Sequence, residues 1–329
     1  MRSLVFKRAL LSLTAIAVPL GIYFLYAHYH ARAVDDLRVH KFLAQQPYLE
    51  LNDDIGFLWK KNLNVTFPAE DWWLDVKTEG VAIEPIVTDP NGFKNDPAAI
   101  TQLATATPEF IGLGDSFMHE AAGVFYAFFK KHGQFYYSLA MQRQCPPQYN
   151  AILTRYALPL HPQHILYGVY ENDFQETGDF REWKASGLDW FAYHSGTWCG
   201  PAITPPRKSE SALVGEEMAD VLQCIVTANT LCLTNHADFT LMLIPSKQYI
   251  VARNHSSIYE TVCYDVLKKE ATARGIRVLD LREIFDREAD PAGLYWKTDG
   301  HWTPRGMDVA VKAYVQSLTT TTTSPGPSP

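Results

Sequence analysis

Apolar and polar positions form two kinds of block along the later two thirds of the chain. Short apolar runs predict buried strands at residues 109–113, 135–140, 165–170, 240–244 and 277–281. Longer runs with apolar residues at helical spacing predict helices at residues 117–131, 147–156, 209–230, 256–274 and 304–318. Strands that alternate with helices are typical of a parallel sheet with helices on both faces. We therefore expect an α/β fold with three layers, α/β/α.

The N-terminus has a different pattern. Residues 9–27 carry no charge, and Arg2, Lys7 and Arg8 precede them. A helix of this length roughly matches the apolar core of a bilayer. We expect a signal anchor over residues 1–29, with its positive end in the cytoplasm and the rest of the chain on the extracytoplasmic, periplasmic side. A cleavable signal peptide is the alternative, although no small-x-small cleavage site precedes His28.

The remaining chain divides by composition. Residues 30–107 are expected to form a stalk and an irregular lead-in, with short β-like pieces at 64–67 and 80–87. Residues 108–318 are expected to form the catalytic domain, with a long loop at 174–207 near the site. Residues 319–329 lack apolar side chains and are expected to be disordered.

Charge excludes one class of partner. The chain has 329 residues, of which 47% are hydrophobic, so it can bury a large core. Its formal net charge is -7 and its pI is about 5.9. Without a basic stripe to neutralise phosphates, the chain is not expected to bind nucleic acid. The oligomeric state does not follow from the sequence.

The candidate chemistry begins at the end of the first predicted strand. Gly112-Leu113-Gly114-Asp115-Ser116 lies between that strand and a helix. At such a turn, the serine hydroxyl points into the crevice beyond the strand, and the first free amides of the helix stabilise negative charge. The glycines permit the tight turn. Ser116 is therefore a candidate nucleophile.

A serine nucleophile needs a base and an orienting carboxylate. Asp299 and His301 lie in a loop after the last predicted strand, two positions apart. This spacing lets the carboxylate reach Nδ1 of His301 and leaves Nε2 for Ser116. Asn172 follows the third predicted strand, and its amide is a candidate oxyanion donor beside the backbone N–H of Ser116. No metal or organic cofactor is needed for this chemistry.

Together these segments resemble the SGNH, or GDSL-type, hydrolase superfamily. Gly114-Asp115-Ser116-Phe117 is similar to its first block, Asn172-Asp173 to its third and Asp299-Gly300-His301-Trp302 to its last. The last block and Leu243-Ile244-Pro245-Ser246-Lys247 are similar to membrane-anchored bacterial members, including relatives of alginate O-acetyltransferases. The resemblance covers about residues 84–316. It implies a flavodoxin-like parallel sheet and an acyl-enzyme on Ser116.

One position departs from the family pattern. The second block normally ends in a glycine whose amide completes the oxyanion hole, and here Arg143 takes that place. If the backbone conformation is retained, Arg143 still donates its amide. The oxyanion hole is therefore assigned to Ser116, Arg143 and Asn172.

These residues predict a serine esterase or O-acyltransferase whose substrate is an ester or acylated carbohydrate of the cell envelope. The alternative is a catalytically silent SGNH-like module that binds polysaccharide or a partner enzyme. A third hypothesis is phosphoester hydrolysis with Asp115, Asp299 and His301 as metal ligands. His119 is expected to pack on its helix face, whereas Glu120 and Glu171 are expected either to bind substrate or to face solvent.

Overall fold

A parallel sheet of five strands holds the site. The computed structural model describes residues 46–66, 85–190 and 210–320. The strand order is β6-β5-β7-β8-β9, and every neighbouring pair is parallel. In chain order this is 2-1-3-4-5, the order of flavodoxin-like sheets. The strands are β5 (Phe110–Leu113), β6 (Tyr136–Ser138), β7 (His164–Val169), β8 (Asp238–Leu243) and β9 (Arg277–Asp280). All five predicted strands are confirmed.

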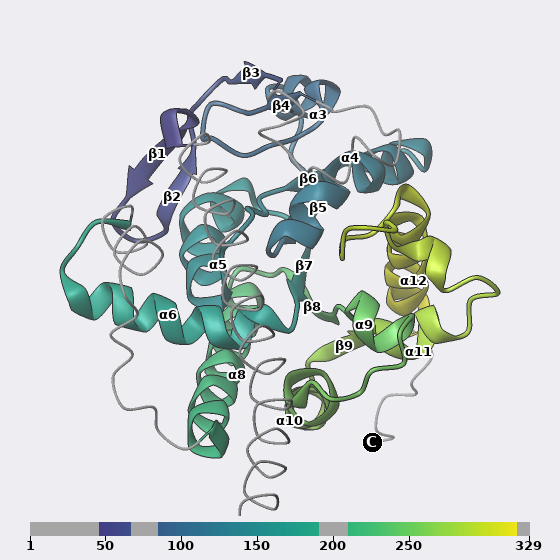
Figure 1. Ribbon diagram of the computed structural model, residues 1–329. Helices are drawn as coiled ribbons and strands as arrows, with labels where there is room; N and C mark the ends of the chain where they lie inside the picture. The colour runs from purple at the N-terminus through teal and green to yellow at the C-terminus, as the bar shows by residue number, and fades with distance from the viewer. Residues whose placement is uncertain (1–45, 67–84, 191–209, 321–329) are drawn as a thin grey trace, which may run out of the picture. The chain divides into compact units, whose positions relative to one another are not determined.

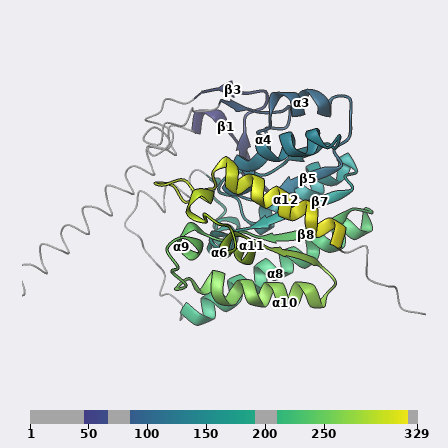
Figure 2. The ribbon, with the colours of Figure 1, turned by 90° about the vertical axis from the view of Figure 1, so that its right-hand side faces the viewer.

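Helices cover both faces of the sheet (Figures 1 and 2). The two that pack together on one face are α4 (Ser116–Lys131) and α12 (Pro304–Thr320). The other face carries α5 (Pro146–Ile152), α8 (Glu210–Thr234) and α10 (Tyr264–Ala273). Side chains between these layers form one continuous apolar core. The predicted three layers are therefore present, because strands buried on both faces need cover on both sides.

Short elements complete the described chain. Two of the predicted helices contain a π-helical turn, Leu153–Ala157 after α5 and Tyr259–Cys263 before α10. The remaining helices are α3 (Pro97–Leu103), α6 (Asn172–Ser186), α9 (Lys247–Ile250) and α11 (Leu281–Asp286). Single 3-10 turns occur at Gln46–Tyr48, Leu158–Leu160 and Ala292–Leu294.

The prediction of a long loop at residues 174–207 is wrong over its first part. Helix α6 spans Asn172–Ser186 and ends at Gly187, which has a left-handed φ of 69°. Its buried side chains include Phe174, Thr177 and Trp183, which are too few and too unevenly spaced to give a helical apolar pattern. Tertiary packing therefore decides this helix. Residues 191–209 lie outside the described residues.

The lead-in forms small antiparallel pairs. Strand β1 (Leu49–Asn52) pairs with β2 (Gly56–Trp59), and β3 (Asn64–Val65) pairs with β4 (Ile86–Val87). The pieces expected at 64–67 and 80–87 thus pair with each other over two residues each. The β1–β2 pair contributes to a second apolar cluster with Met141, Trp183 and Trp190.

Both ends of the chain lie outside the described residues. The tail expected to be disordered from residue 319 begins later, because α12 continues through Thr320, and residues 321–329 lie outside the described residues. The expected anchor at residues 1–29 also lies outside them. In the segments that are described, no helix is long and apolar enough to cross a membrane. The chain divides into two compact units. The smaller unit comprises Met1–Pro47 and His194–Ile203, and only Gln46 and Pro47 of it belong to the described residues.

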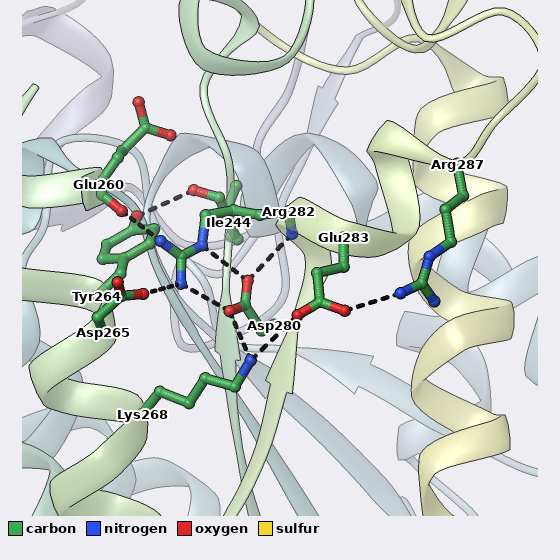
Figure 3. A network of polar contacts seen from close by, with 9 residues as sticks. All are labelled: Ile244, Glu260, Tyr264, Asp265, Lys268, Asp280, Arg282, Glu283 and Arg287. Atoms are coloured by element: carbon green, nitrogen blue, oxygen red, sulfur yellow. Dashed lines mark hydrogen bonds and ion pairs between the residues drawn. The ribbon is translucent and has the colours of Figure 1, made fainter. Parts of the chain in front are cut away.

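A buried arginine joins β9, α10 and α11 (Figure 3). Arg282 donates from Nε to Asp280 Oδ1 at 3.0 Å and from Nη2 to Asp280 Oδ2 at 2.7 Å. Nη2 also contacts Asp265 at 2.7 Å, and Nη1 donates to the carbonyl of Glu260. The side chains of Arg282 and Asp280 are 9% and 5% exposed. Burial raises the pKa of Asp280, but Arg282 and Lys268 outweigh it and hold that pKa below its usual value.

Arg282→Met is therefore expected to lower the free energy of unfolding by about 3 kcal/mol, because it leaves the carboxylate of Asp280 buried without its main partner. Urea unfolding of the full chain measures this change. Arg287→Met is the matched control, since Arg287 pairs with Glu283 on the surface and is 75% exposed. That control should cost less than about 1 kcal/mol. Equal losses in the two variants would contradict the assigned role of the network.

Candidate active site

Ser116 lies where the sequence predicts it, at the turn between β5 and α4. The turn depends on Gly114, because a Cβ there would come within 2.5 Å of Met118. Asp115 caps the helix by accepting from the backbone N–H of Phe117 at 3.0 Å. Ser116 is the first residue of α4, so its own N–H is among those that the helix leaves unpaired.

The structure brings Ser116, His301 and Asp299 together. Nε2 of His301 lies 2.8 Å from Oγ of Ser116, and Nδ1 lies 2.8 Å from Oδ1 of Asp299. The same Asp299 oxygen accepts from the backbone N–H of His301 at 3.2 Å. Because Asp299 and His301 are two positions apart, the carboxylate of Asp299 binds both the imidazole and the backbone N–H of His301. The geometry allows a proton to pass from Ser116 to His301 while Asp299 fixes the ring.

The charges around His301 favour the imidazolium. Burial lowers the pKa of His301, but Glu120, Asp299 and Asp115 together raise it to about 9. Burial raises the pKa of Asp299, yet the hydrogen bond from His301 holds it below its ordinary value. A proton taken from Ser116 is thus stabilised on His301 by surrounding carboxylates.

Glu120 is the residue whose contact with the site the sequence did not reveal. Its Oε1 lies 4.0 Å from Nδ1 of His301, so a second carboxylate faces the imidazole beside Asp299. The Glu120 side chain is 23% exposed and turned toward His301, so it does not simply face solvent. Glu120 lies four positions after Ser116, which puts both side chains on the same face of α4.

Asp115 and His119 have other partners. Burial raises the pKa of Asp115 to about 6, and its Oδ2 is 3.5 Å from Oγ of Ser116, too long for a strong hydrogen bond. His119 is buried and accepts from Nε1 of Trp59 at 3.3 Å, so it packs on its helix face as expected. Among the described residues, no group of three or more His, Cys, Asp or Glu side chains has a metal-holding arrangement.

Arg143 has a backbone conformation that glycine adopts more readily than other residues. Its φ is 59°, in the left-handed region that glycine favours. The preceding loop is held against the nucleophile turn, because the N–H of Met141 donates to the carbonyl of Gly114 at 3.1 Å. A left-handed φ at this position is compatible with the amide donation predicted for Arg143.

Asn172, the other candidate donor, is the first residue of α6. Its Nδ2 donates to Oε1 of Glu176, one turn further along, at 3.0 Å. An amide nitrogen carries two hydrogens, so this bond fixes the amide and leaves its second hydrogen for an oxyanion. Burial raises the pKa of Glu176 to about 8, while the charge of Arg143 opposes the rise. Glu176 thus interacts with two of the candidate oxyanion residues, by a hydrogen bond with Asn172 and by charge with Arg143.

Asn172→Ala is expected to lower kcat for an aryl acetate about 100-fold with a smaller change in KM, because the lost hydrogen bond strengthens only as the oxyanion develops. Steady-state kinetics measure both constants. Asn235→Ala, exposed between α8 and β8, is the matched control and should retain full activity. An increase in KM with an unchanged kcat would contradict the oxyanion role.

Lys247 holds the loop that carries Asp299. Its Nζ donates to the carbonyl oxygens of Trp296 at 2.6 Å, of Lys297, and more weakly of Asp299 at 3.4 Å. The preceding Ser246 is fixed by Glu260, whose carboxylate accepts from its N–H and its hydroxyl at 2.6 Å each. Lys247, the last residue of the run that carries the family resemblance, thus positions this loop.

Comparison with known proteins agrees with the resemblance. Residues 218–327 match a family model described as "SGNH hydrolase-like domain, acetyltransferase AlgX". The matched segment contains Asp299 and His301 and begins after Ser116, Arg143 and Asn172. A search of curated proteins found no match.

Several solved structures are remotely similar. A GDSL-like lipase from Bacteroides thetaiotaomicron VPI-5482 shares 14% identity, with 68% of this chain and 96% of that chain covered and a TM-score of 0.45. A lipase/acylhydrolase from Enterococcus faecalis shares 10%, covering 65% and 96%, with a TM-score of 0.43. Axe2, an acetylxylan esterase from Geobacillus stearothermophilus, shares 10%, covering 65% and 94%, with a TM-score of 0.42.

Proposed function

Because the chain carries an SGNH hydrolase-like segment related to AlgX, we propose that it is a serine esterase or O-acyltransferase acting on ester-linked acyl groups. The observation that carries the proposal is the pair of 2.8 Å contacts that joins Ser116 to His301 and His301 to Asp299. Two further features support it: the free N–H of Ser116 at the start of α4 and the left-handed backbone at Arg143.

The mechanism follows from these positions. Oγ of Ser116 attacks the ester carbonyl while Nε2 of His301 takes its proton, and Asp299 keeps Nδ1 protonated. The oxyanion accepts from the N–H groups of Ser116 and Arg143 and from the amide of Asn172. His301 then protonates the departing alcohol and leaves an acyl-enzyme on Ser116. Water or a sugar hydroxyl, deprotonated by His301, attacks the acyl carbonyl and releases Ser116.

The setting is also a proposal. An uncharged stretch at residues 9–27, preceded by three positive residues, supports a membrane anchor. By the positive-inside rule, the catalytic domain would then lie on the extracytoplasmic, periplasmic side. Acylated carbohydrate of the cell envelope is the substrate class that suits this location. The description of the matched family as an acetyltransferase supports acetyl as the acyl group.

A fluorophosphonate reagent tests the proposal on the full chain, because it reacts covalently only with an activated serine. We expect labelling at Ser116, no labelling of Ser116→Ala and unchanged labelling of Ser317→Ala, a control on α12. A folded protein that never labels would contradict the enzyme. That result would favour the silent module that binds polysaccharide or a partner enzyme.

A further inference from the structure

A cavity of about 730 Å³ opens beside the candidate oxyanion hole. One side is the end of β7 and the first turn of α6, and the other is the segment at residues 256–259. Its lining residues are Tyr170, Glu171, Asn172, Gln175, Ser256, Ser257, Ile258 and Tyr259. We call this cavity the Glu171 groove. Its volume lies within the usual range of ligand sites.

The Glu171 groove adjoins the catalytic residues in two ways. Asn172 belongs both to the groove and to the candidate oxyanion hole. Tyr170, also in the groove, has its ring centroid 4.4 Å from that of Phe117, which in turn lies 4.8 Å from the imidazole of His301. The Glu171 groove is therefore connected to the imidazole of His301 through one intervening ring, that of Phe117.

The polar groups of the groove suit hydroxyl-bearing ligands. Oε2 of Glu171 accepts from the hydroxyl of Ser257 at 2.6 Å, which fixes the carboxylate and leaves it further acceptor capacity. Gln175 and Ser256 are exposed and can both donate and accept. Ile258, which is 38% exposed, adds an apolar surface. Clustered acceptors and donors beside an apolar surface fit the alternating hydroxyls and C–H faces of a sugar ring.

The charge of the groove argues against an acidic sugar. Among the described residues that line it, none is lysine or arginine, and Glu171 is the one carboxylate. A second carboxylate lies behind the wall, where Glu217 Oε2 accepts from the hydroxyl of Tyr259 at 2.8 Å. A ligand carboxylate would meet like charge with no cation among these residues to balance it.

We propose that the Glu171 groove binds an uncharged, polyhydroxylated saccharide that presents its ester, or its accepting hydroxyl, to Ser116. The inference rests on the proposed esterase or O-acyltransferase function and narrows its substrate. A uronic acid polymer is the class that it disfavours.

The test uses the full chain and two substrates that differ in one group, a mono-O-acetylated methyl glucoside and the corresponding methyl glucuronoside. We expect kcat/KM to favour the neutral ester by about tenfold or more, since like charge in a cleft costs several kcal/mol when unscreened. Glu171→Gln should reduce this preference by about threefold or more, because removing the negative charge raises kcat/KM for the glucuronoside relative to the neutral ester. Glu50→Gln, on the exposed face of β1, makes the same change of charge and should leave the preference unaltered.

The outcomes separate the two proposals. Equal turnover of the two esters, preference for the glucuronoside, or the same change in both variants would overturn the groove inference alone. The same holds if an aryl acetate is hydrolysed and Ser116 is labelled while both sugar esters are inert. If neither labelling nor aryl ester turnover occurs, the esterase proposal fails, and the inference built on it fails with it.

Discussion

Replacing His301 by alanine is expected to lower kcat for an aryl acetate by about four to six orders of magnitude. Without the imidazole, the partner that the described residues leave to Oγ of Ser116 is Asp115 Oδ2, which is a poor base here because it lies 3.5 Å away and its carboxylate already caps α4 through the other oxygen. Asp299→Asn keeps the shape of the loop but stabilises the wrong tautomer of His301, and we expect a loss of about 10⁴-fold.

Stopped-time assays with the purified full chain measure these losses, after subtraction of spontaneous hydrolysis. His132→Ala is the control, since His132 lies exposed at the far end of α4, where its Nδ1 contacts the carbonyl of Phe128. It should retain full turnover. A double variant, Ser116→Ala with His301→Ala, should be no slower than either single variant, because the two residues act as one unit. Additive losses would contradict the shared mechanism.

The parts of the site that could be predicted are those that follow from topology. In a parallel sheet, loops after the carboxyl ends of strands meet at one edge, and Ser116 and Asn172 follow the ends of the neighbouring strands β5 and β7. The Asp-x-His spacing predicted the Asp299–His301 contact, and the structure has it at 2.8 Å. Strand positions were predictable for a related reason, since strands buried on both faces are apolar throughout.

The parts that could not be predicted depend on contacts between distant segments. The α6 helix has little apolar periodicity, and packing of Phe174 and Trp183 decides its conformation. The contact between Glu120 and His301 requires the C-terminal loop to fold over α4. Similarly, the backbone of Arg143 is set by the loop that follows β6, and no propensity of arginine predicts a φ of 59°.

The support of the catalytic loop extends further than its immediate contacts. Arg282 binds the carbonyl of Glu260, and the carboxylate of Glu260 binds Ser246. Lys247, next in sequence, holds the carbonyl oxygens of the loop that ends in Asp299. Burial raises the pKa of Glu260 to about 7. The network in Figure 3 is thus continuous with the residues that position Asp299. Arg282→Met should therefore lower activity as well as stability.

Turnover should depend steeply on pH. His301 accepts the proton of Ser116 only when it is neutral, and its pKa is raised to about 9 from an ordinary value of 6.5. We therefore expect kcat/KM for an aryl acetate to rise about tenfold per pH unit below pH 9 and to level off above it, a change of about a thousandfold from pH 6. The dependence reports the free protein, in which Glu120 and Asp299 both face the imidazole.

Glu120→Gln identifies the cause of this dependence. Among the groups that raise the pKa of His301, Glu120 is the first, and the amide removes its charge while keeping its shape. The midpoint of the pH profile should therefore move toward lower pH, and activity near pH 7 should increase relative to the plateau. Glu283→Gln, on the exposed side of α11, should leave the midpoint in place. A midpoint near 6.5 in the unmodified protein, or one that does not move in Glu120→Gln, would contradict the role assigned to the second carboxylate.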